Sequence, residues 1–422
     1  MSKKEIIAII GLGYVGLPLA VKFGKKFKTI GFDKNKKRIN ELKEFKDKTN
    51  ELNEDKIKNS KNLIFSSQSS VLSSASIFII TVPTPINNLN NPDLRPLKEA
   101  TKVVAKHISN NSVVIIESTV YPGVTEEICV PILERYSNMK YNLDFFCGYS
   151  PERINPGDKT KTISKIVKVI SGSNKATVLR IKKLYSKIIT AGVYEASSIR
   201  TAEMAKAIEN AQRDINIAFV NEIAIMCNKL QLRTKDVLDA AKTKWNFLNF
   251  EPGLVGGHCI SVDPYYLYYS SKKLGYEPKI ILSGRNINNN MSNFISNNLV
   301  KELSKRIKLI NSKVLILGVT FKENCPDVRN SQVIKIIKNL KKKKISVDVS
   351  DEIADEETLK SEFKISLIKK LKKNHYDAIL ITVKHNIFKN YGLKTIKSLC
   401  KKNGFIYDIK NTFNDRTIEM NL

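Results

Sequence analysis

The amino-acid sequence predicts an α/β protein in which two doubly wound domains are joined by a long central helix and a helical middle domain. Short apolar runs alternate with helical stretches at the start of the chain, and the alternation restarts after Asn311. Between them lies an unbroken helical pattern over residues 199–230. Alternating strands and helices are typical of parallel sheets with helices on both faces. We therefore expect three domains, over residues 1–198, 199–311 and 312–422.

Each domain has its own pattern of elements. The first has apolar runs typical of buried strands at residues 5–10, 28–32, 76–82 and 112–117, with a helix over residues 15–27. The last has such strands at residues 313–318, 345–350, 378–383 and 405–408. The central helix carries an apolar stripe made of Met204, Ile208, Ala211, Ile215, Phe219, Ile223, Met226 and Leu230. A helix of this length can form a dimer contact, so we expect a homodimer through it.

The composition is that of a folded globular chain with an excess of lysine. The 422 residues carry 71 Lys and Arg against 41 Asp and Glu, a formal charge of +30. Such a charge is common in nucleic-acid binders, but here it is spread along the chain, without basic segments interleaved with aromatic residues. The run Lys341–Lys344 ends a predicted helix, where cations favour the helix dipole. We expect a solvated lysine-rich surface and no nucleic-acid partner.

Cysteine spacing and hydropathy exclude further classes. The 6 cysteines and 4 histidines are dispersed, which argues against a disulfide framework or a structural metal. No apolar run reaches the roughly 18 residues that a membrane helix needs, and the first apolar run is too short for the apolar core of a signal sequence. We expect a cytoplasmic protein with no metal and no membrane partner.

A glycine-rich turn follows the first predicted strand and opens the first predicted helix. It reads Gly11-Leu12-Gly13-Tyr14-Val15-Gly16. Glycine here permits a tight turn and a close approach of pyrophosphate to backbone amides, and the helix N-terminus favours its charge. Asp33, at the end of the next strand, would bind the ribose hydroxyls and repel a 2′-phosphate, so the segment predicts a Rossmann-like NAD site. Arg38 and several lysines follow directly and weaken the preference for NAD over NADP.

The most informative segment of the chain places a cysteine after two glycines in an expected loop. It reads Gly256-Gly257-His258-Cys259-Ile260-Ser261-Val262-Asp263-Pro264. For a cysteine taken alone, a buried structural role is the more common one. The alternative is a nucleophilic thiolate, which requires a pocket with cationic or hydrogen-bonding neighbours.

Three other segments could supply such neighbours. Lys206, Asn210 and Arg213 are spaced i, i+4 and i+7 on one polar face of the central helix, where they could hold an oxyanion or stay solvated. The segment 117–119 ends a predicted buried strand, at the edge where open α/β sheets bind ligands. Glu152 lies in a Pro-bounded loop, a natural position for an acid or base.

Seven motifs follow in order along the chain: GLGYVGLPLA (11–20), ITVPTP (80–85), ESTVYPG (117–123), SPERINPGD (150–158), EMAKAIENAQRDINIAFVNE (203–222), GGHCISVDPYYL (256–267) and GVTFKENCPDVRNS (318–331). With them the chain resembles, over essentially its full length, the UDP-glucose/GDP-mannose dehydrogenase family and most closely its UDP-N-acetylhexosamine 6-dehydrogenase branch. The resemblance implies a UDP-sugar substrate and an NAD-dependent four-electron oxidation of its primary alcohol at carbon 6 to a carboxylate.

The resemblance also implies roles for individual residues. The thiolate of Cys259 would trap the intermediate aldehyde as a thiohemiacetal, whose oxidation gives a thioester that water hydrolyses. The matching positions imply that Lys206 and Asn210 stabilise an oxyanion, and that Asp263 assists proton handling. Thr119 would orient the water and Glu152 would be a general base. The residues that would flank the nicotinamide half of NAD or contact the cofactor nearby are Val82, Pro83, Thr84, Ser118 and Thr119.

The third domain would hold the nucleotide of the substrate. By the resemblance Lys322 would reach the sugar or the pyrophosphate, and Arg285 matches a position that contacts substrate; without the match, both would be surface cations. The remaining expected substrate contacts are Glu152, Arg153, Lys206, Asn210, Arg213, Gly256, His258 and Phe321.

Two departures from the family pattern bear on the substrate. The UDP-glucose branch has a second glutamate four residues after the first, where this chain has Pro156, so water activation would depend more on Glu152 and Thr119. Ser261 replaces an expected glycine, while His258 fits the acetylated-hexosamine branch. We expect oxidation of UDP-N-acetylglucosamine, then UDP-N-acetylgalactosamine, for a surface polysaccharide such as capsule or lipopolysaccharide; UDP-N-acetylmannosamine and UDP-glucose are alternatives.

Two other classes of protein stay open. A two-electron hydroxyacid or 6-phosphogluconate-type dehydrogenase would share the first domain and a helical middle, and it would need no thiolate. A basic nucleic-acid-binding protein on the same scaffold would bind DNA or RNA with steep salt dependence.

Overall fold

The structure is a computed structural model that describes residues 5–87, 89–154, 160, 162–257 and 259–422. It forms two compact units, Met1–Glu209 with Tyr265–Tyr276, and Asn210–Pro264 with Glu277–Leu422. The boundary between the two units falls inside the central helix, between Glu209 and Asn210. The predicted division into three domains is not tested by it and stays a prediction.

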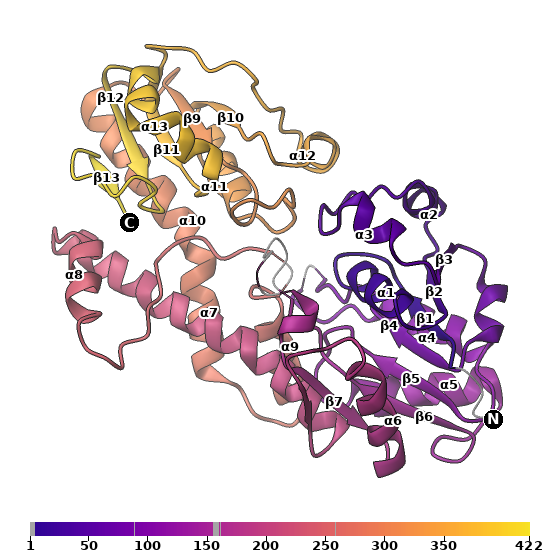
Figure 1. Ribbon diagram of the computed structural model, residues 1–422. Helices are drawn as coiled ribbons and strands as arrows, with labels where there is room; N and C mark the ends of the chain where they lie inside the picture. Colours follow the sequence, from indigo (N-terminus) through magenta and orange to yellow (C-terminus); the bar gives the residue numbers. More distant parts are fainter. Residues whose placement is uncertain (1–4, 88, 155–159, 161, 258) are drawn as a thin grey trace. The chain divides into compact units, whose positions relative to one another are not determined.

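The first unit is built on an eight-stranded sheet with strand order β3-β2-β1-β4-β5-β6-β7-β8 (Figure 1). Its strands are β1 (Ile7–Ile10), β2 (Thr29–Phe32), β3 (Leu63–Ser66), β4 (Ile77–Ile80), β5 (Ser112–Ile116), β6 (Phe145–Tyr149), β7 (Lys168–Gly172) and β8 (Val193–Glu195). All neighbours pair in parallel except β6 and β7, which are antiparallel. The four strands predicted here are confirmed as β1, β2, β4 and β5, with ends shifted by a few residues.

Helices cover this sheet because its central strands are apolar on both faces. Ile7 and Ile9 of β1 join a core with residues of α1 and α6, while Ala8 and Ile10, which point the other way, are equally buried. The helices are α1 (Gly16–Gly24), α2 (Lys36–Lys43), α3 (Glu54–Lys58), α4 (Arg95–Ala105), α5 (Val130–Ser137), α6 (Lys175–Tyr185) and α9 (Asp263–Lys273).

The predicted central helix is confirmed as α7 (Ile199–Lys229). Its buried apolar positions are mostly small side chains, namely Ala202, Ala207, Ala211, Ala218, Ala224 and Cys227. Five large members of the predicted stripe, Met204, Ile208, Phe219, Met226 and Leu230, are 43% to 64% exposed in the single chain, whereas Ile215 and Ile223 are partly buried. No helix among the described residues is both long and apolar enough to cross a membrane.

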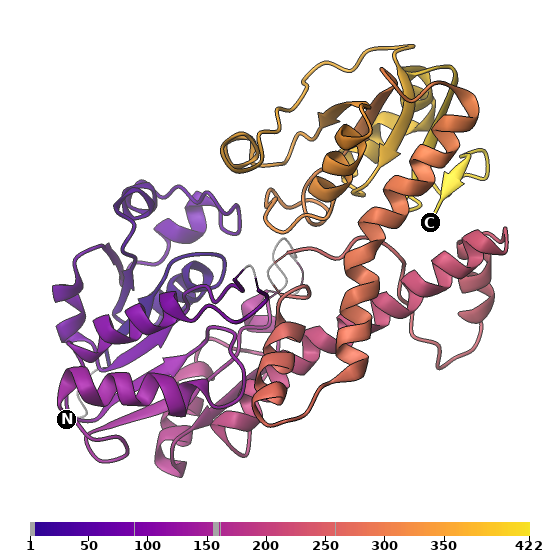
Figure 2. The same cartoon turned by 180° about the vertical axis from the view of Figure 1, so that it is seen from behind.

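The second unit contains a five-stranded parallel sheet with strand order β10-β9-β11-β12-β13. Its strands are β9 (Lys313–Leu317), β10 (Ser346–Ser350), β11 (Tyr376–Ile381), β12 (Cys400–Asp408) and β13 (Met420–Asn421), which confirms the four predicted strands. Its helices are α8 (Thr234–Ala241), α10 (Lys279–Arg306), α11 (Val333–Lys342), α12 (Glu356–Phe363) and α13 (Asn386–Leu399). Figure 2 shows α10 as a second long helix, which sequence analysis did not predict.

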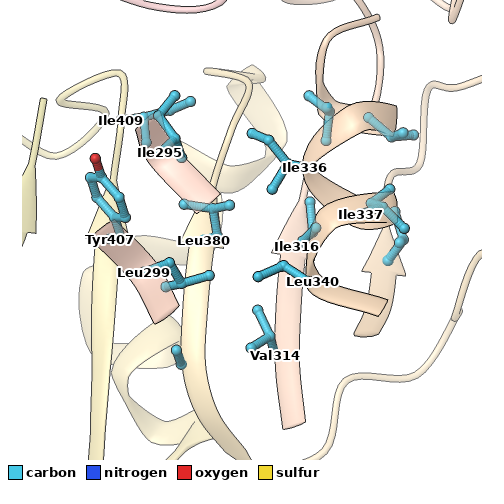
Figure 3. Close-up of a cluster of buried hydrophobic side chains, with 14 of the residues drawn as sticks. Ile295, Leu299, Val314, Ile316, Ile336, Ile337, Leu340, Leu380, Tyr407 and Ile409 are labelled. Atoms are coloured by element: carbon cyan, nitrogen blue, oxygen red, sulfur yellow. The ribbon is translucent and has the colours of Figure 1, made fainter. Parts of the chain in front are cut away.

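The core of the second sheet follows the alternation of its strands. Val314 and Ile316 of β9 and Leu380 of β11 pack with α10 and α11, as Figure 3 shows with Ile295, Leu299, Ile336 and Leu340. Leu315, Leu317, Ile379 and Ile381 point to the opposite face and pack with α13. Both faces of this sheet are buried, and for this reason the sequences of its strands are continuous apolar runs.

The first strand of each sheet ends in the same kind of glycine turn. Gly11 follows β1 with φ +96°, and Gly318 follows β9 with φ +91°, both in the region that favours glycine. Thr81 Oγ1 donates to the carbonyl oxygen of Gly11 at 2.7 Å, and Thr382 Oγ1 donates to that of Gly318 in the same way. A neighbouring strand therefore fixes each turn.

An aspartate accompanies each turn, but the surroundings of the two differ. Asp33 Oδ2 accepts from the Leu12 amide at 2.9 Å, and Asp351 Oδ2 accepts from the Val319 amide at 2.7 Å. Asp351 is also 3.2 Å from Nε2 of the fully buried His385. The second aspartate is thus enclosed by the protein, whereas Asp33 is partly exposed.

Candidate active site

The glycine turn of the first unit is shaped for a dinucleotide. A Cβ on Gly11 would meet Val82 Cγ1 at 3.1 Å, and one on Gly16 would lie 1.8 Å from the Gly11 carbonyl oxygen. A Cβ on Gly13 would meet nothing within 4 Å. Gly11 and Gly16 therefore allow close packing of strand and helix, while Gly13 leaves open space where a pyrophosphate could approach the backbone.

The N-terminus of α1 adds a favourable field for phosphate. Val15 occupies the N-cap and has no side-chain hydrogen bond to the first turn. Tyr14 and Val15 are partly exposed at this point. Amide groups in the first turn of a helix can bind an anion when no side chain caps them. Tyr14 and Val15 therefore fit the pyrophosphate of the predicted NAD.

Asp33 is held rigidly at the end of β2. Its Oδ2 accepts from the Leu12 amide and its Oδ1 accepts from the Asn35 amide, each at 2.9 Å. Carboxylate oxygens have further lone pairs, so the fixed Asp33 can still accept from ribose hydroxyls. This arrangement fits an unphosphorylated adenosine ribose.

Arg38 lies beside this aspartate but is paired with another acid. Its Nε donates to the Leu12 carbonyl at 2.9 Å and its Nη2 donates to Asp47 Oδ1 at 2.8 Å. The Asp47 side chain is fully buried and that of Arg38 is 10% exposed. The cation expected to weaken the preference for NAD is thus paired with Asp47, which sequence analysis did not single out.

The loops after β4 and β5 meet at the carboxyl edge of the sheet. Ser118 Oγ donates to the Val82 carbonyl and Thr84 Oγ1 donates to the Thr119 carbonyl, both at 2.6 Å. Tyr266 also donates to the Thr84 carbonyl. The structure therefore brings together the predicted nicotinamide-flanking residues, with Pro83 exposed beside them.

Glu152 belongs to a buried cluster of charges in the first unit. Its Oε1 accepts from the amides of Arg153 and Ile154, each at 2.7 Å. Its Oε2 lies 3.4 Å from Nζ of Lys168, which is also 2.9 Å from Glu117 Oε2. Burial raises the pKa of Glu117 to about 6, although Lys168 opposes the shift.

The neighbouring cations are placed differently. Arg153 forms an ion pair with Glu209 at 2.8 Å and donates to the Val167 carbonyl at 3.0 Å. Lys206, on α7, is 8% exposed. Arg153 is therefore part of a local network rather than a free cation. The substrate contacts predicted for Arg153 and Lys206 stay proposals.

Glu203, one turn before Lys206 on α7, was also missed. It accepts from the Gly123 amide at 2.5 Å, the Thr125 amide at 2.9 Å and Thr125 Oγ1 at 2.7 Å. Burial raises the pKa of Glu203 to about 7. This carboxylate ties α7 to the loop that follows Thr119.

In the second unit, the predicted nucleophile is distinguished by its exposure. Cys259 is exposed, whereas Cys129, Cys147, Cys227 and Cys325 are buried and Cys400 is intermediate. Burial raises the pKa of the Cys129 thiol and of the Cys400 thiol, each to about 12. Among the six cysteines, Cys259 is the one placed to react with a ligand from solvent.

The cysteine loop packs against the segment that contains Phe321. Gly257 has φ +87°, and a Cβ there would lie 2.7 Å from the Phe321 ring. A Cβ on Gly256 would lie 2.7 Å from the Asn330 carbonyl oxygen. Both glycines are therefore required for close packing, and Phe321 has a structural contact with the loop.

Polar contacts fix the remainder of the loop. Ser261 Oγ donates to the Gly257 carbonyl at 2.6 Å, so the serine that departs from the family pattern closes the turn. The Asp263 amide donates to the Cys259 carbonyl at 2.8 Å. Asn210 Nδ2 donates to Asp263 Oδ2 at 2.5 Å, which brings two of the predicted catalytic residues together.

The cations of this unit have three different environments. Arg285 is 2% exposed and its Nη1 pairs with Asp214 at 2.5 Å, so it is not a surface cation, and its predicted substrate contact stays untested. Arg213 is exposed and Lys322 is partly exposed. His258, predicted to contact substrate, lies outside the described residues, as does Pro156.

Asn221 on α7 is a further residue that sequence analysis missed. Its Nδ2 donates to the Gly253 carbonyl at 3.0 Å, and to Asn288 Oδ1 on α10 at 2.8 Å. From sequence alone, an asparagine on a helix is expected to be exposed to solvent. Only the fold shows that Asn221 is fully buried.

Comparison with known proteins covers nearly the whole chain. Models of the UDP-glucose/GDP-mannose dehydrogenase family match it in three parts: the NAD binding domain at residues 5–189, the central domain at residues 200–290 and the UDP binding domain at residues 315–415.

Individual proteins are similar over the same extent. The chain is 51% identical to UDP-N-acetyl-D-glucosamine 6-dehydrogenase of Salmonella typhi, over 96% of this chain and 95% of that protein. It is 48% identical to the enzyme of the same name from Pseudomonas aeruginosa, over 99% of each. The structure of UDP-D-ManNAc dehydrogenase from Pyrococcus horikoshii has a TM-score of 0.88 at 28% identity, covering 98% of this chain and 97% of that chain.

Proposed function

This chain belongs to the UDP-glucose/GDP-mannose dehydrogenase family, and we propose that it is a UDP-N-acetylhexosamine 6-dehydrogenase that oxidises UDP-N-acetylglucosamine. It is an NAD-dependent UDP-sugar dehydrogenase with an NAD-binding and a UDP-binding domain. The observation that carries the proposed substrate is the 48% to 51% identity, over nearly the full length, to two UDP-N-acetyl-D-glucosamine 6-dehydrogenases.

The proposed reaction converts the primary alcohol at carbon 6 into a carboxylate. NAD, when bound, accepts the hydride of each of two successive oxidations, so one sugar yields two NADH and consumes one water. The Cys259 thiolate adds to the aldehyde carbon between the oxidations and forms a thiohemiacetal, which keeps the aldehyde covalently attached. The exposure of Cys259 supports this role.

Polar side chains would stabilise the charge that develops on the oxygen at carbon 6. Lys206 and Asn210 lie four residues apart on α7 and carry donors suited to an oxyanion. The hydrogen bond from Asn210 to Asp263 orients the asparagine amide. Asp263 would then receive a proton released near the cysteine.

Hydrolysis of the thioester needs a base that activates water. Glu152 is the proposed base, because two amides and Lys168 hold its carboxylate in one orientation. Thr119 would orient the attacking water through its hydroxyl, since Thr84 contacts only its carbonyl oxygen here. The water proton passes to Glu152 and the sulfur leaves as a thiolate.

Assays over a panel of UDP-sugars test the proposal. The wild type should form two NADH per molecule of UDP-N-acetylglucosamine, with less turnover of the galacto and manno epimers and of UDP-glucose. Cys259→Ser should lose complete oxidation, while Cys400→Ser, which alters a partly buried thiol, should retain it. Turnover of UDP-glucose alone would overturn the acetylated substrate, and one NADH per sugar would indicate a two-electron dehydrogenase.

The remaining proposals concern assembly and biological setting. We propose a homodimer formed through the exposed apolar stripe of α7, because those large side chains have no cover within the described chain. We also propose three domains divided at residues 198 and 311, and the extents of the three family models support this division. The product would supply an acidic sugar for a surface polysaccharide, made in the cytoplasm.

A further inference from the structure

We propose that Lys168 is a positioning residue for the reaction, because it holds the Glu152 carboxylate in place and balances its charge together with Glu117. The inference rests on the proposed function, in which Glu152 activates water. Glu117 has no role in the mechanism above, and Lys168 appears there only as a contact of the Glu152 carboxylate. All the residues involved lie in the first unit, at the carboxyl ends of β5 and β6 and at the start of β7.

The geometry of Lys168 matches its chemistry. An ammonium group has three N–H donors. Nζ of Lys168 has three acceptors within reach: Glu117 Oε2 at 2.9 Å, the Pro151 carbonyl at 3.1 Å and Glu152 Oε2 at 3.4 Å. Two of these acceptors belong to the same loop, so Lys168 fixes both the backbone that carries Glu152 and its carboxylate.

Because the three charged side chains are buried, the charge of each strongly affects the ionisation of the others. The side chains of Lys168, Glu117 and Glu152 are 4%, 0% and 9% exposed. Two carboxylates and one ammonium leave a net charge of −1 in a region largely shielded from solvent. Without the ammonium, two nearby carboxylates could not both stay ionised, and one of them would take up a proton. A protonated Glu152 cannot accept a proton from water.

Other groups around the cluster do not replace Lys168. Tyr185 on α6 donates to Glu117 and carries no charge, since burial raises the pKa of its hydroxyl well above the ordinary value. Arg153 is instead paired with Glu209 on α7. Among the described residues Lys168 therefore provides the nearest positive charge to Glu152 that the structure records.

The opposing interpretation is a purely structural ion pair between β5 and β7. Such a pair would affect folding and would leave the ionisation of Glu152 unchanged. The two roles are separated by the pH dependence of thioester hydrolysis, and by a double variant in which the charge of the cluster is restored.

The test compares Lys168→Met, the double variant Lys168→Met/Glu117→Gln, and the wild type. Hydrolysis is followed as the steady-state rate after the burst of NADH in rapid mixing, and by intact mass of the acyl group on Cys259. In Lys168→Met the acidic limb of the hydrolysis profile should move up by at least one pH unit, a rate loss of about tenfold below the limb. The double variant, with one carboxylate and no ammonium, should move back toward the wild type.

Each outcome has one meaning. A Lys168→Met profile identical to that of the wild type, or a double variant shifted as far as the single one, would overturn the inference. If Lys168→Met does not fold, Glu117→Gln alone serves: the limb should move to lower pH, and an unmoved limb overturns the inference. A wild type that makes no uronate from any UDP-N-acetylhexosamine would instead refute the proposed function, which separates the two failures.

Discussion

Asn221 and Gly253 form a reciprocal pair of hydrogen bonds in the second unit. The Asn221 amide nitrogen donates to the Gly253 carbonyl at 3.0 Å, and its Oδ1 accepts from the Gly253 amide at 2.7 Å. Gly253 has φ +153° and leads into the cysteine loop three residues before Gly256. The Asn221 side chain thus bonds to both backbone groups of Gly253, as a neighbouring strand would. It fixes the position at which the cysteine loop begins.

Removal of this pair should loosen the loop. Asn221→Ala leaves the Gly253 amide and carbonyl without this partner, at a cost of about 1–3 kcal/mol in the free energy of unfolding. Turnover should fall by about tenfold or more, because the cysteine loop loses its orientation, while NAD affinity should not change. Asn228→Ala, at an exposed position of the same helix, is the control. Equal loss of NAD affinity would contradict this account.

The first and last glycines of the cofactor turn should respond differently from the middle one. Gly16→Ala should destabilise the first unit by about 1–3 kcal/mol, because its Cβ would overlap the Gly11 carbonyl. Gly13→Ala should leave thermal unfolding within about 0.5 kcal/mol of the wild type and weaken NAD binding about tenfold, since its methyl group enters open space next to the helix N-terminus. Calorimetric unfolding and NAD titration of both variants provide the comparison; unchanged NAD affinity in Gly13→Ala would refute the placement of the pyrophosphate.

Asp47 should control the choice between NAD and NADP. Asp47→Asn removes the charge that pairs with Arg38 at 2.8 Å, so the guanidinium becomes available to a 2′-phosphate. A charge-assisted hydrogen bond contributes about 1.5–3 kcal/mol, so kcat/KM with NADP should rise about tenfold relative to NAD. The gain should disappear in the double variant Asp47→Asn/Arg38→Ala. An unchanged cofactor ratio in Asp47→Asn would show that Arg38 does not reach the ribose.

Stability should depend on the ionisation of Glu203. Its pKa is about 7 in the folded chain against an ordinary 4.5, so the folded protein binds this proton more tightly than the unfolded chain. Its stabilising contribution is complete below about pH 4.5 and is lost as the pH rises through 7. The difference in unfolding free energy between Glu203→Gln and the wild type should therefore shift in favour of the variant over this range, by up to about 3 kcal/mol.

Urea unfolding of both proteins at a series of pH values measures this shift. A constant difference between them at all pH values reflects only the changed hydrogen bonds to Gly123 and Thr125. A difference that does not vary between pH 4.5 and 7 would mean that Glu203 titrates normally.

The apolar stripe of α7 should carry the proposed dimer. Phe219 is 54% exposed and Met226 is 50% exposed in the single chain. Phe219→Glu places a charge among buried apolar groups of the partner, and loss of a buried aromatic anchor costs about 2 kcal/mol or more in association. Light scattering during gel filtration should therefore show a shift from dimer to monomer. Asn228→Ala, which is exposed and lies two and a half turns from Phe219, on the opposite face of the helix, should stay dimeric, and a Phe219→Glu dimer would refute this interface.

Local patterns made the cofactor region predictable. Gly11, Gly16 and Asp33 lie within one strand-helix-strand segment, and their spacing reflects contacts between residues close in sequence. The carboxyl edges of β4 and β5 also followed from short apolar runs. By contrast α10 was missed, because its asparagines and serines interrupt the apolar periodicity, although three of them, Asn288, Ser292 and Ser296, are buried.

Residues that act through distant partners could not be found in the sequence. Lys168 lies in a lysine-rich chain and its partners are 16 and 51 positions away, so it resembles a surface cation. Arg285 was attributed to substrate binding by resemblance alone, and only the fold reveals its pairing with Asp214. Cys259 could be recognised by its motif, yet its exposure, which separates it from five other cysteines, required the structure.

The two glycine turns differ in their ability to bind the adenosine ribose of NAD. Asp351 occupies the position in the second sheet that Asp33 has in the first, but its Oδ2 is within 3.2 Å of His385 Nε2, and Asn324 donates to Nδ1 of the same ring at 3.0 Å. An adenosine ribose should therefore find an acid able to accept its hydroxyls at only one of the two glycine turns. NAD should therefore not compete for the second sheet, even though the glycine turns that follow β1 and β9 have the same kind of backbone conformation and hydrogen bond.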